Sequence, residues 1–367
     1  MRILFMADVP PDPNAGAAGT ELRTAGALRG LGHEVDAVWA LQLGRRIPHG
    51  NLHYLLELPR AYRREMRRAL ATKHYDVLHV NQPHGFLAAK ARPQGSIFVH
   101  RSHGLELRVE RDLAPWRPKP KIVSRAMAAL LARHSRLIAR YADGHIVSCS
   151  DDAKFLRDEL GVDLRRIAVI AQAAPDPFVQ SPATPMSEER LQRVLYVSQF
   201  AFFKAPAVAA TVMSRLARLR PELRFTWVCG RAHHSDVRAL LGDAPVELLD
   251  WMPAEALRDV YDAHGIFLFT SYVEGFGKVF LEAMSRGLCV VSTRVGGAPD
   301  LINSGDNGVL IPVGDAGAAV AATESLLMDF GAAARMSSRA AETARAHTWN
   351  RVGRETAAFY ERLFSLT

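Results

Sequence analysis

The chain has 367 residues, of which 49% are hydrophobic and 23% are charged, and its formal net charge is +8. This length is enough for two hydrophobic cores, and the composition is typical of globular proteins and excludes disordered and fibrous ones. Apolar runs stay shorter than about eighteen residues and the three cysteines are scattered, which excludes a membrane-spanning helix and a complete disulfide framework and indicates a reduced, cytoplasmic protein.

Short apolar runs alternate with helical patterns through the first half of the chain. They predict strands over residues 2–7, 34–39, 76–81, 96–103, 144–149 and 167–170. Such an alternation is typical of a parallel sheet that helices cover on both faces. The loop after the first strand contains Gly16, which either lets backbone amides approach a phosphate at a helix N-terminus or makes a simple tight turn.

Positive charge is concentrated in the same half. Residues 1–180 contain 27 Lys and Arg against 18 Asp and Glu, whereas residues 181–367 contain 19 against 20. A cationic helix is predicted over 59–70, and the segment 116–140 mixes basic with apolar residues. For each segment two interpretations remain open, a solvated helix face or peripheral contact with an anionic membrane. No recognised module supports nucleic-acid binding.

The second half repeats the alternation after a proline-rich stretch, residues 175–185, which we interpret as the connection between two domains. Strands are predicted over 194–198, 224–229, 246–249, 266–270, 289–292 and 309–311. We therefore predict an α/β fold of two Rossmann-like domains, residues 1–175 and 186–349, whose parallel sheets face each other across a cleft.

The most informative segment runs from Ser271 to Met284. It follows the apolar run at 266–270, turns through two glycines and enters an amphipathic helix. Glu274 lies at the turn and Glu282 lies inside the helix, and eight helical residues rise about 12 Å, comparable to the distance from the sugar to the ribose of a nucleotide-diphosphate sugar. The glycines let backbone amides meet a phosphate at the helix N-terminus, where the helix dipole favours anions.

Three segments together resemble retaining glycosyltransferases of family four, which have the GT-B fold and a Glu-x7-Glu motif. They are residues 271–284, the strand and Gly-Gly-x-Pro turn at 287–300, and the stretch 306–312. The resemblance implies a hexosyltransferase that uses a nucleotide-diphosphate sugar and retains the sugar's configuration. It also implies a last helix, residues 350–367, that crosses back to the first domain. No Asp-x-Asp occurs, which agrees with a mechanism that needs neither a metal ion nor a cofactor.

The same resemblance assigns the residues that carry the chemistry. Glu274 would hold donor-sugar hydroxyls, Lys204 would neutralise the departing diphosphate, and His103 would contact the donor sugar. The other residues that it places against the donor are Gly16, Gly230, Arg231, Met252, Gly275, Phe276, Gly277 and Glu282. Gln199 stands where the family has an arginine, and Arg231 is a candidate replacement for that cation.

The acceptor is expected to be a sugar, a lipid-linked molecule or a small molecule, met in the cytoplasm or at the inner face of the membrane. Two other functions remain open. The same fold supports epimerases and hydrolases that act on the nucleotide sugar without an acceptor. The substitution at Gln199 leaves room for a nucleotide-sugar-binding protein with weak catalysis.

Overall fold

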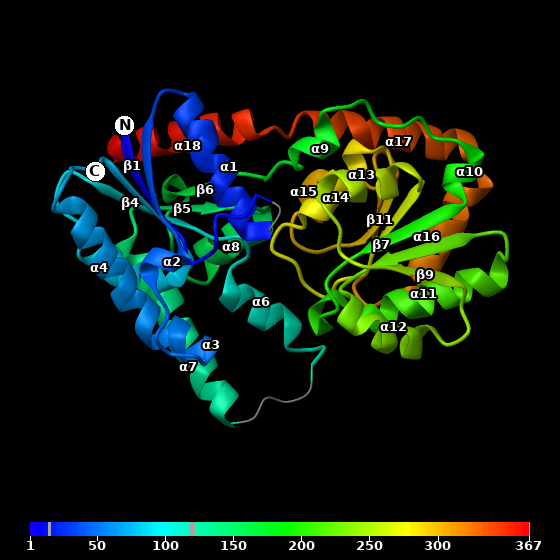
Figure 1. Cartoon of the computed structure of the whole chain (residues 1–367), viewed down its shortest axis with the longest axis horizontal. Helices are drawn as coiled ribbons and strands as arrows, with labels where there is room; N and C mark the ends of the chain where they lie inside the picture. Colours follow the sequence, from blue (N-terminus) through cyan, green and yellow to red (C-terminus); the bar gives the residue numbers. More distant parts are fainter. Residues whose placement is uncertain (14–15, 118–121, 367) are drawn as a thin grey trace. The chain divides into compact units, whose positions relative to one another are not determined.

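The computed structural model describes residues 1–13, 16–117 and 122–366, with the side chains of 122–125 left aside. Its contacts divide the chain into two compact units; in Figure 1 the first is coloured blue to green together with the red C-terminal helix, and the second is coloured green to orange. The first unit consists of Met1–Gln172 and Trp349–Thr367, and the second of Ala173–Thr348.

The first unit is built on a parallel six-stranded sheet with the order β2-β1-β3-β4-β5-β6. All six strands start and end within two residues of the predicted positions: β1 (Arg2–Met6), β2 (Glu34–Val38), β3 (Val77–Asn81), β4 (Ile97–Arg101), β5 (Gly144–Val147) and β6 (Ile167–Val169). Alternate residues of β1 belong to separate hydrophobic clusters, Ile3 and Phe5 to one and Leu4 and Met6 to the other. The sheet is therefore buried on both faces, as its continuous apolar runs predict.

Helices cover the two faces of this sheet. The first cluster includes residues of α1 (Gly16–Gly30) and α18 (Trp349–Phe364), and the second includes residues of α4 (Leu58–Leu70), α5 (Phe86–Lys90) and α7 (Ile122–Tyr141). The remaining helices of this unit are α2 (Ala40–Leu43), α3 (Gly50–Leu52), α6 (Glu106–Leu113) and α8 (Ser150–Asp158). A Cβ at Gly353 would lie 2.7 Å from the Ala27 Cβ, so glycine allows α18 to pack closely on α1. The last helix therefore belongs to the first unit, as predicted.

The second unit contains another parallel sheet, with the order β12-β11-β10-β7-β8-β9. Its strands confirm the predicted ones: β7 (Arg193–Val197), β8 (Arg224–Val228), β9 (Val246–Leu249), β10 (Ile266–Phe269), β11 (Cys289–Thr293) and β12 (Val309–Ile311). Its helices are α9 (Asp176–Val179), α10 (Glu188–Leu191), α11 (Pro206–Leu219), α12 (His234–Leu241), α13 (Ala254–Asp262), α14 (Lys278–Ser285), α15 (Ala298–Leu301), α16 (Ala316–Met328) and α17 (Phe330–Arg345).

The strand order of the second sheet creates a topological switch point. From β7 the chain moves outward to β8 and β9, then returns to β10 on the other side of β7. The connections after β7 and β10 therefore leave the carboxyl ends of these strands in opposite directions. Open α/β sheets bind ligands at this position.

The proline-rich stretch packs with the second unit. Arg286 is 2% exposed, and its guanidinium donates to the carbonyl oxygens of Phe178, Ser181 and Pro182 at 2.9–3.2 Å. The same side chain makes a bidentate pair with Asp262. The boundary between the units accordingly falls just before this stretch, between residues 172 and 173.

Candidate functional site

The loops after β7 and β10 bring Lys204 and Glu274 together. Lys204 Nζ forms an ion pair with Glu274 Oε2, and the two side chains are only 15% and 14% exposed. The amide of Tyr272 donates to the carbonyl oxygen of Phe203 at 2.8 Å, which joins the two loops next to the pair. A cation and a carboxylate thus lie at the switch point of the second sheet.

Aromatic rings surround the lysine. Its Nζ lies 5.2 Å from the ring centre of Phe203 and 5.4 Å from that of Phe269. Tyr196 Oη donates to the Lys204 carbonyl oxygen at 2.9 Å, which fixes the backbone. The next residue, Ala205, has a left-handed backbone with φ +52°, a conformation that glycine adopts more readily than alanine. The charge of Lys204 is therefore held in a defined, partly desolvated place.

Glycines shape the loop that carries Glu274. Gly277 has φ +87° at the start of α14, and a Cβ there would lie 2.5 Å from the Phe280 ring. A Cβ at Gly296 would lie 2.9 Å from the Glu274 Cβ and 2.8 Å from the Gly275 carbonyl oxygen. The amide of the following glycine, residue 297, donates to the carbonyl oxygen of residue 276 at 3.0 Å. The Gly-Gly turn therefore sets where Glu274, Gly275 and Phe276 lie.

Glu282 lies inside α14 and is 8% exposed, so it is not a solvated helix residue. Tyr261 Oη donates to Glu282 Oε2 at 3.2 Å. Burial, followed by the charge of Glu282, raises the pKa of Tyr261 well above its usual value. Tyr261 is fully buried against Phe178 and Phe267 and therefore holds one carboxylate oxygen in place. Nothing in the local sequence indicates this role for Tyr261.

A third carboxylate organises the loops after β8 and β9. Asp250 Oδ1 accepts hydrogen bonds from the amides of Arg231 at 3.0 Å and Trp251 at 2.8 Å, which lower the pKa of Asp250. A Cβ at Gly230 would lie 3.3 Å from the Trp251 indole nitrogen, so these loops pack closely. The side chain of Arg231 is exposed and Met252 is half-buried.

The remaining predicted residues belong to the first unit. Gly16 begins α1, is exposed, and leaves a Cβ position with no protein atom within 4 Å, so nothing in the fold itself requires a glycine there. Ala15 precedes it and lies outside the described residues. Gly19 differs, since a Cβ there would lie 2.4 Å from the Pro13 carbonyl oxygen.

His103 follows β4 and hydrogen-bonds through Nε2 to Glu21 Oε1 at 2.8 Å. Glu21 is fully buried in α1. Burial alone raises the pKa of Glu21, but the hydrogen bond from His103, the neighbouring imidazole of His79 and the charge of Arg101 outweigh it and hold that pKa well below its usual value. His103 is therefore anchored to a buried carboxylate, which the sequence analysis also missed.

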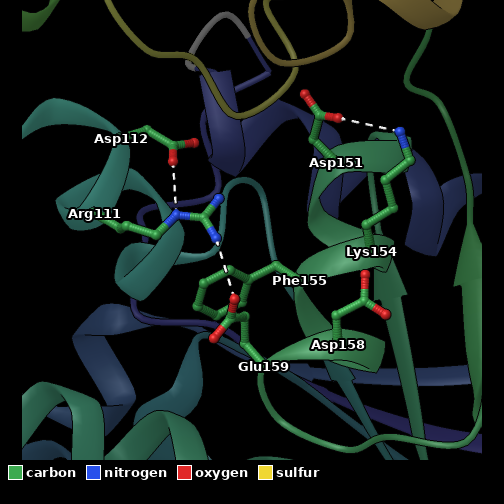
Figure 2. A pocket seen from close by; sticks show the side chains of 7 residues that line it. All are labelled: Arg111, Asp112, Asp151, Lys154, Phe155, Asp158 and Glu159. Atoms are coloured by element: carbon green, nitrogen blue, oxygen red, sulfur yellow. Dashed lines mark hydrogen bonds and ion pairs between the residues drawn. The ribbon is translucent and has the colours of Figure 1, made fainter.

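A separate hollow of about 240 Å³ lies between α6 and α8 of the first unit (Figure 2). Both cations that line it are paired, Arg111 with Asp112 and Glu159, and Lys154 with Asp151. Carboxylates predominate around it, so it is unsuited to a diphosphate. Among the described residues, those of this hollow included, no group of three or more His, Cys, Asp or Glu is arranged to hold a metal ion.

Two family models match the chain. Residues 16–174 match the one described as Glycosyltransferase Family 4, and residues 192–329 match the one described as Glycosyl transferases group 1. Together they account for most of both units.

Curated relatives share between a quarter and a third of the aligned residues. The D-inositol 3-phosphate glycosyltransferase of Corynebacterium efficiens is 28% identical over 239 residues, which are 60% of this chain and 56% of that protein. The chain thus spans little more than half the length of this relative. The phosphatidyl-myo-inositol mannosyltransferase of Mycolicibacterium smegmatis is 26% identical over 98% of this chain and 94% of that protein.

Solved structures share the whole architecture. Sucrose-phosphate synthase from Thermosynechococcus elongatus has a TM-score of 0.79 at 21% identity, and Anabaena HepE in complex with UDP has 0.69 at 18%, each over the full length of both chains. These likenesses show the two-domain Rossmann-like GT-B fold.

Proposed function

We propose that this chain, which belongs to the glycosyltransferases of family 4, transfers a hexose from a nucleotide-diphosphate sugar to an acceptor, with retention of configuration and without a metal ion. The observation that carries the proposal is the Lys204–Glu274 pair at the switch point of the second sheet. Such a pair offers a cation to a leaving diphosphate and a carboxylate to sugar hydroxyls within one narrow space.

In the proposed reaction the bond between the sugar's anomeric carbon and the diphosphate oxygen breaks while the acceptor oxygen bonds to the same face of that carbon. Lys204 stabilises the charge that develops on the diphosphate, together with the N-terminus of α14 at Gly277. The acceptor's proton goes to the departing phosphate oxygen. Glu274 and His103 hold sugar hydroxyls, and Glu282 accepts hydrogen bonds from the ribose.

The proposed acceptor is a polyol that carries a phosphate. Two relatives are named for inositol 3-phosphate and phosphatidyl-myo-inositol, and the excess of Lys and Arg in residues 1–180 favours an anionic acceptor. UDP is the first nucleotide to test, since it occupies the related HepE.

We also propose peripheral contact with anionic membranes. The helix α4 carries exposed arginines such as Arg60 and Arg67, and Leu41, Leu52 and Leu56, in the elements that precede it, are 92%, 41% and 44% exposed. Cations next to exposed apolar side chains are typical of interfacial segments. Residues 118–121 of the second basic segment lie outside the described residues, and no helix in the described parts of the chain is long and apolar enough to cross a bilayer.

Flotation with anionic and with neutral vesicles at low salt tests this contact. Arg60→Glu with Arg67→Glu should abolish flotation with anionic vesicles, and Arg215→Glu with Arg218→Glu, two exposed positions of α11 in the second unit, is the matched control. Flotation that is equal for both vesicle types, or unaffected by the paired substitutions, would remove the membrane from the proposal.

The transfer itself is tested by mixing the purified protein with UDP-, GDP-, ADP- and dTDP-sugars and with inositol 3-phosphate or phosphatidylinositol, with and without EDTA. Mass spectrometry reads the product, and NMR reads its anomeric configuration. Glu274→Gln should abolish transfer, whereas Glu247→Gln, an exposed position in β9, should not. Nucleotide release that needs no acceptor would favour an epimerase or hydrolase. Tight donor binding with no turnover would favour a binding protein, as Gln199 suggests, and loss of activity in EDTA would contradict metal independence.

A further inference from the structure

A line of buried polar groups connects the last helix of the first unit to His103. Tyr360 Oη lies 2.5 Å from His79 Nδ1, and His79 Nε2 lies 3.6 Å from Glu21 Oε2. The other carboxylate oxygen, Glu21 Oε1, lies 2.8 Å from His103 Nε2. The side chains of Glu21 and His79 are at most 1% exposed, whereas His103 keeps 16% exposure at the end of the line.

Glu21 occupies a position where an apolar residue would pack without the desolvation energy of a buried carboxylate. The residues of α1 that face the sheet recur at helical spacing and include Ala18, Ala25 and Leu28, and Glu21 lies on the same stripe. A buried ionised carboxylate costs desolvation energy, and hydrophobic replacements of buried ion pairs are often neutral or stabilising. Packing therefore gives no reason for a glutamate at this position. Its polar neighbours His79, Arg101 and His103 do, and of these His103 makes the hydrogen bond to the carboxylate.

We propose that Glu21 is a positioning residue for His103. Its carboxylate holds the imidazole by Nε2–H, which fixes the ring orientation and leaves Nδ1 as the nitrogen that meets a ligand. Within the described residues Nδ1 has no hydrogen-bond partner. Because the neutral ring then carries its hydrogen on Nε2, Nδ1 accepts a hydrogen bond and the ligand hydroxyl donates it. The identity of that ligand, the donor sugar, rests on the proposed function.

Histidine NMR on the free full-length protein tests the arrangement directly. With ¹⁵N-labelled histidine, and His103→Ala to assign the signal, the wild type should show the hydrogen of His103 on Nε2. In Glu21→Gln and Glu21→Leu the ring should populate both tautomers. Thr356→Val, a buried change in α18, is the matched control and should leave the His103 signal as in the wild type.

Transfer kinetics test the consequence. Glu21→Leu should lower kcat by about 10- to 150-fold, the value of one charge-assisted hydrogen bond, with a smaller change in KM. The double variant Glu21→Leu with His103→Ala should be no slower than His103→Ala alone, because Glu21 acts only through His103 and both changes remove the same interaction. Thr356→Val should retain wild-type kcat.

Two results would overturn the proposal. One is a His103 tautomer that stays unchanged in both Glu21 variants. The other is a double variant whose loss equals the product of the single losses, since Glu21 would then act independently of His103. A wild type that transfers no sugar would refute the proposed function instead, and the NMR measurement would still decide the role of Glu21.

Discussion

Gly296→Ala should impair the donor site without touching a charged group. Glycine at this position has φ +55°, and an added Cβ would lie 2.8–2.9 Å from atoms of Glu274 and Gly275. Ordinary contacts of a Cβ begin at about 3.4 Å, so the loop that carries Glu274 would have to move by about half an ångström. Backbone strain adds about 1–2 kcal/mol of destabilisation, because the left-handed region is unfavourable for alanine.

Gly305→Ala is the matched control. Gly305 lies in the same unit with φ +91°, and an added Cβ there would meet no atom within 4 Å. Both variants therefore incur the backbone cost, which corresponds to a fall in Tm of about 2–8 °C for a domain of this size. Only Gly296→Ala should also displace Glu274.

Since a displacement of about 1 Å at a reacting centre costs about a hundredfold in rate, half an ångström predicts roughly a tenfold loss of kcat/KM in Gly296→Ala. Calorimetric unfolding and transfer kinetics, measured for both variants with one UDP-sugar, separate the two effects. Equal kcat/KM for the two variants would refute the reasoning, because the Gly-Gly turn would then not determine where Glu274 lies.

Four further changes have defined outcomes. Lys204→Met should lower kcat/KM by about 10- to 150-fold in transfer assays, since one charge-assisted phosphate contact is lost. Gln199→Arg adds a bidentate hydrogen-bond donor for phosphate at an exposed position of the same loop and should raise kcat/KM about tenfold. An unchanged kcat/KM would mean that another cation already binds the diphosphate. Tyr261→Phe should weaken nucleotide binding about 2- to 13-fold by calorimetry, because Glu282 loses a donor. Burial lowers the pKa of His145 from 6.5 to about 3, so below pH 6.5 the unfolded chain binds a proton that the folded chain does not. The free energy of unfolding should therefore be highest above about pH 6.5 and fall by about 1.4 kcal/mol for each pH unit below it. Denaturant unfolding of His145→Asn should show a smaller decrease of this free energy with falling pH.

The sequence predicted the strands well and the side-chain partnerships poorly. Parallel strands that are buried on both faces are nearly continuous apolar runs, so β1 and β10 are visible without any knowledge of the fold. The loop with Glu274 was predicted because its string of glycines and carboxylates resembles that of family-four glycosyltransferases. That Glu274 pairs with Lys204, 70 residues away, depends on the order of β7 and β10 in the sheet, which local sequence does not encode.

The roles of Tyr261 and Glu21 were not predicted, for a related reason. Tyr261 faces Glu282 only because α13 packs on α14, and a tyrosine in an amphipathic helix has the same local signal whether or not its hydroxyl has a partner. Glu21 is 82 residues from His103, and its burial follows from the rotation of α1 about its axis. The one signal available was a carboxylate on the apolar stripe of that helix.

Arg286 and Glu21 are two of the buried charged residues, and they differ in how fully their hydrogen bonds are made. All the N–H groups of Arg286 reach carbonyl or carboxylate oxygens, from the stretch 178–182 and from Asp262, as a buried charge with a structural role requires. Glu21 Oε2 and His103 Nδ1 have no hydrogen-bond partner among the described residues. A buried polar group left in this state is costly unless water or a ligand completes it. The complete network therefore marks Arg286 as a residue that secures the proline-rich stretch, and the incomplete one marks Glu21 and His103 as groups arranged for a molecule that binds.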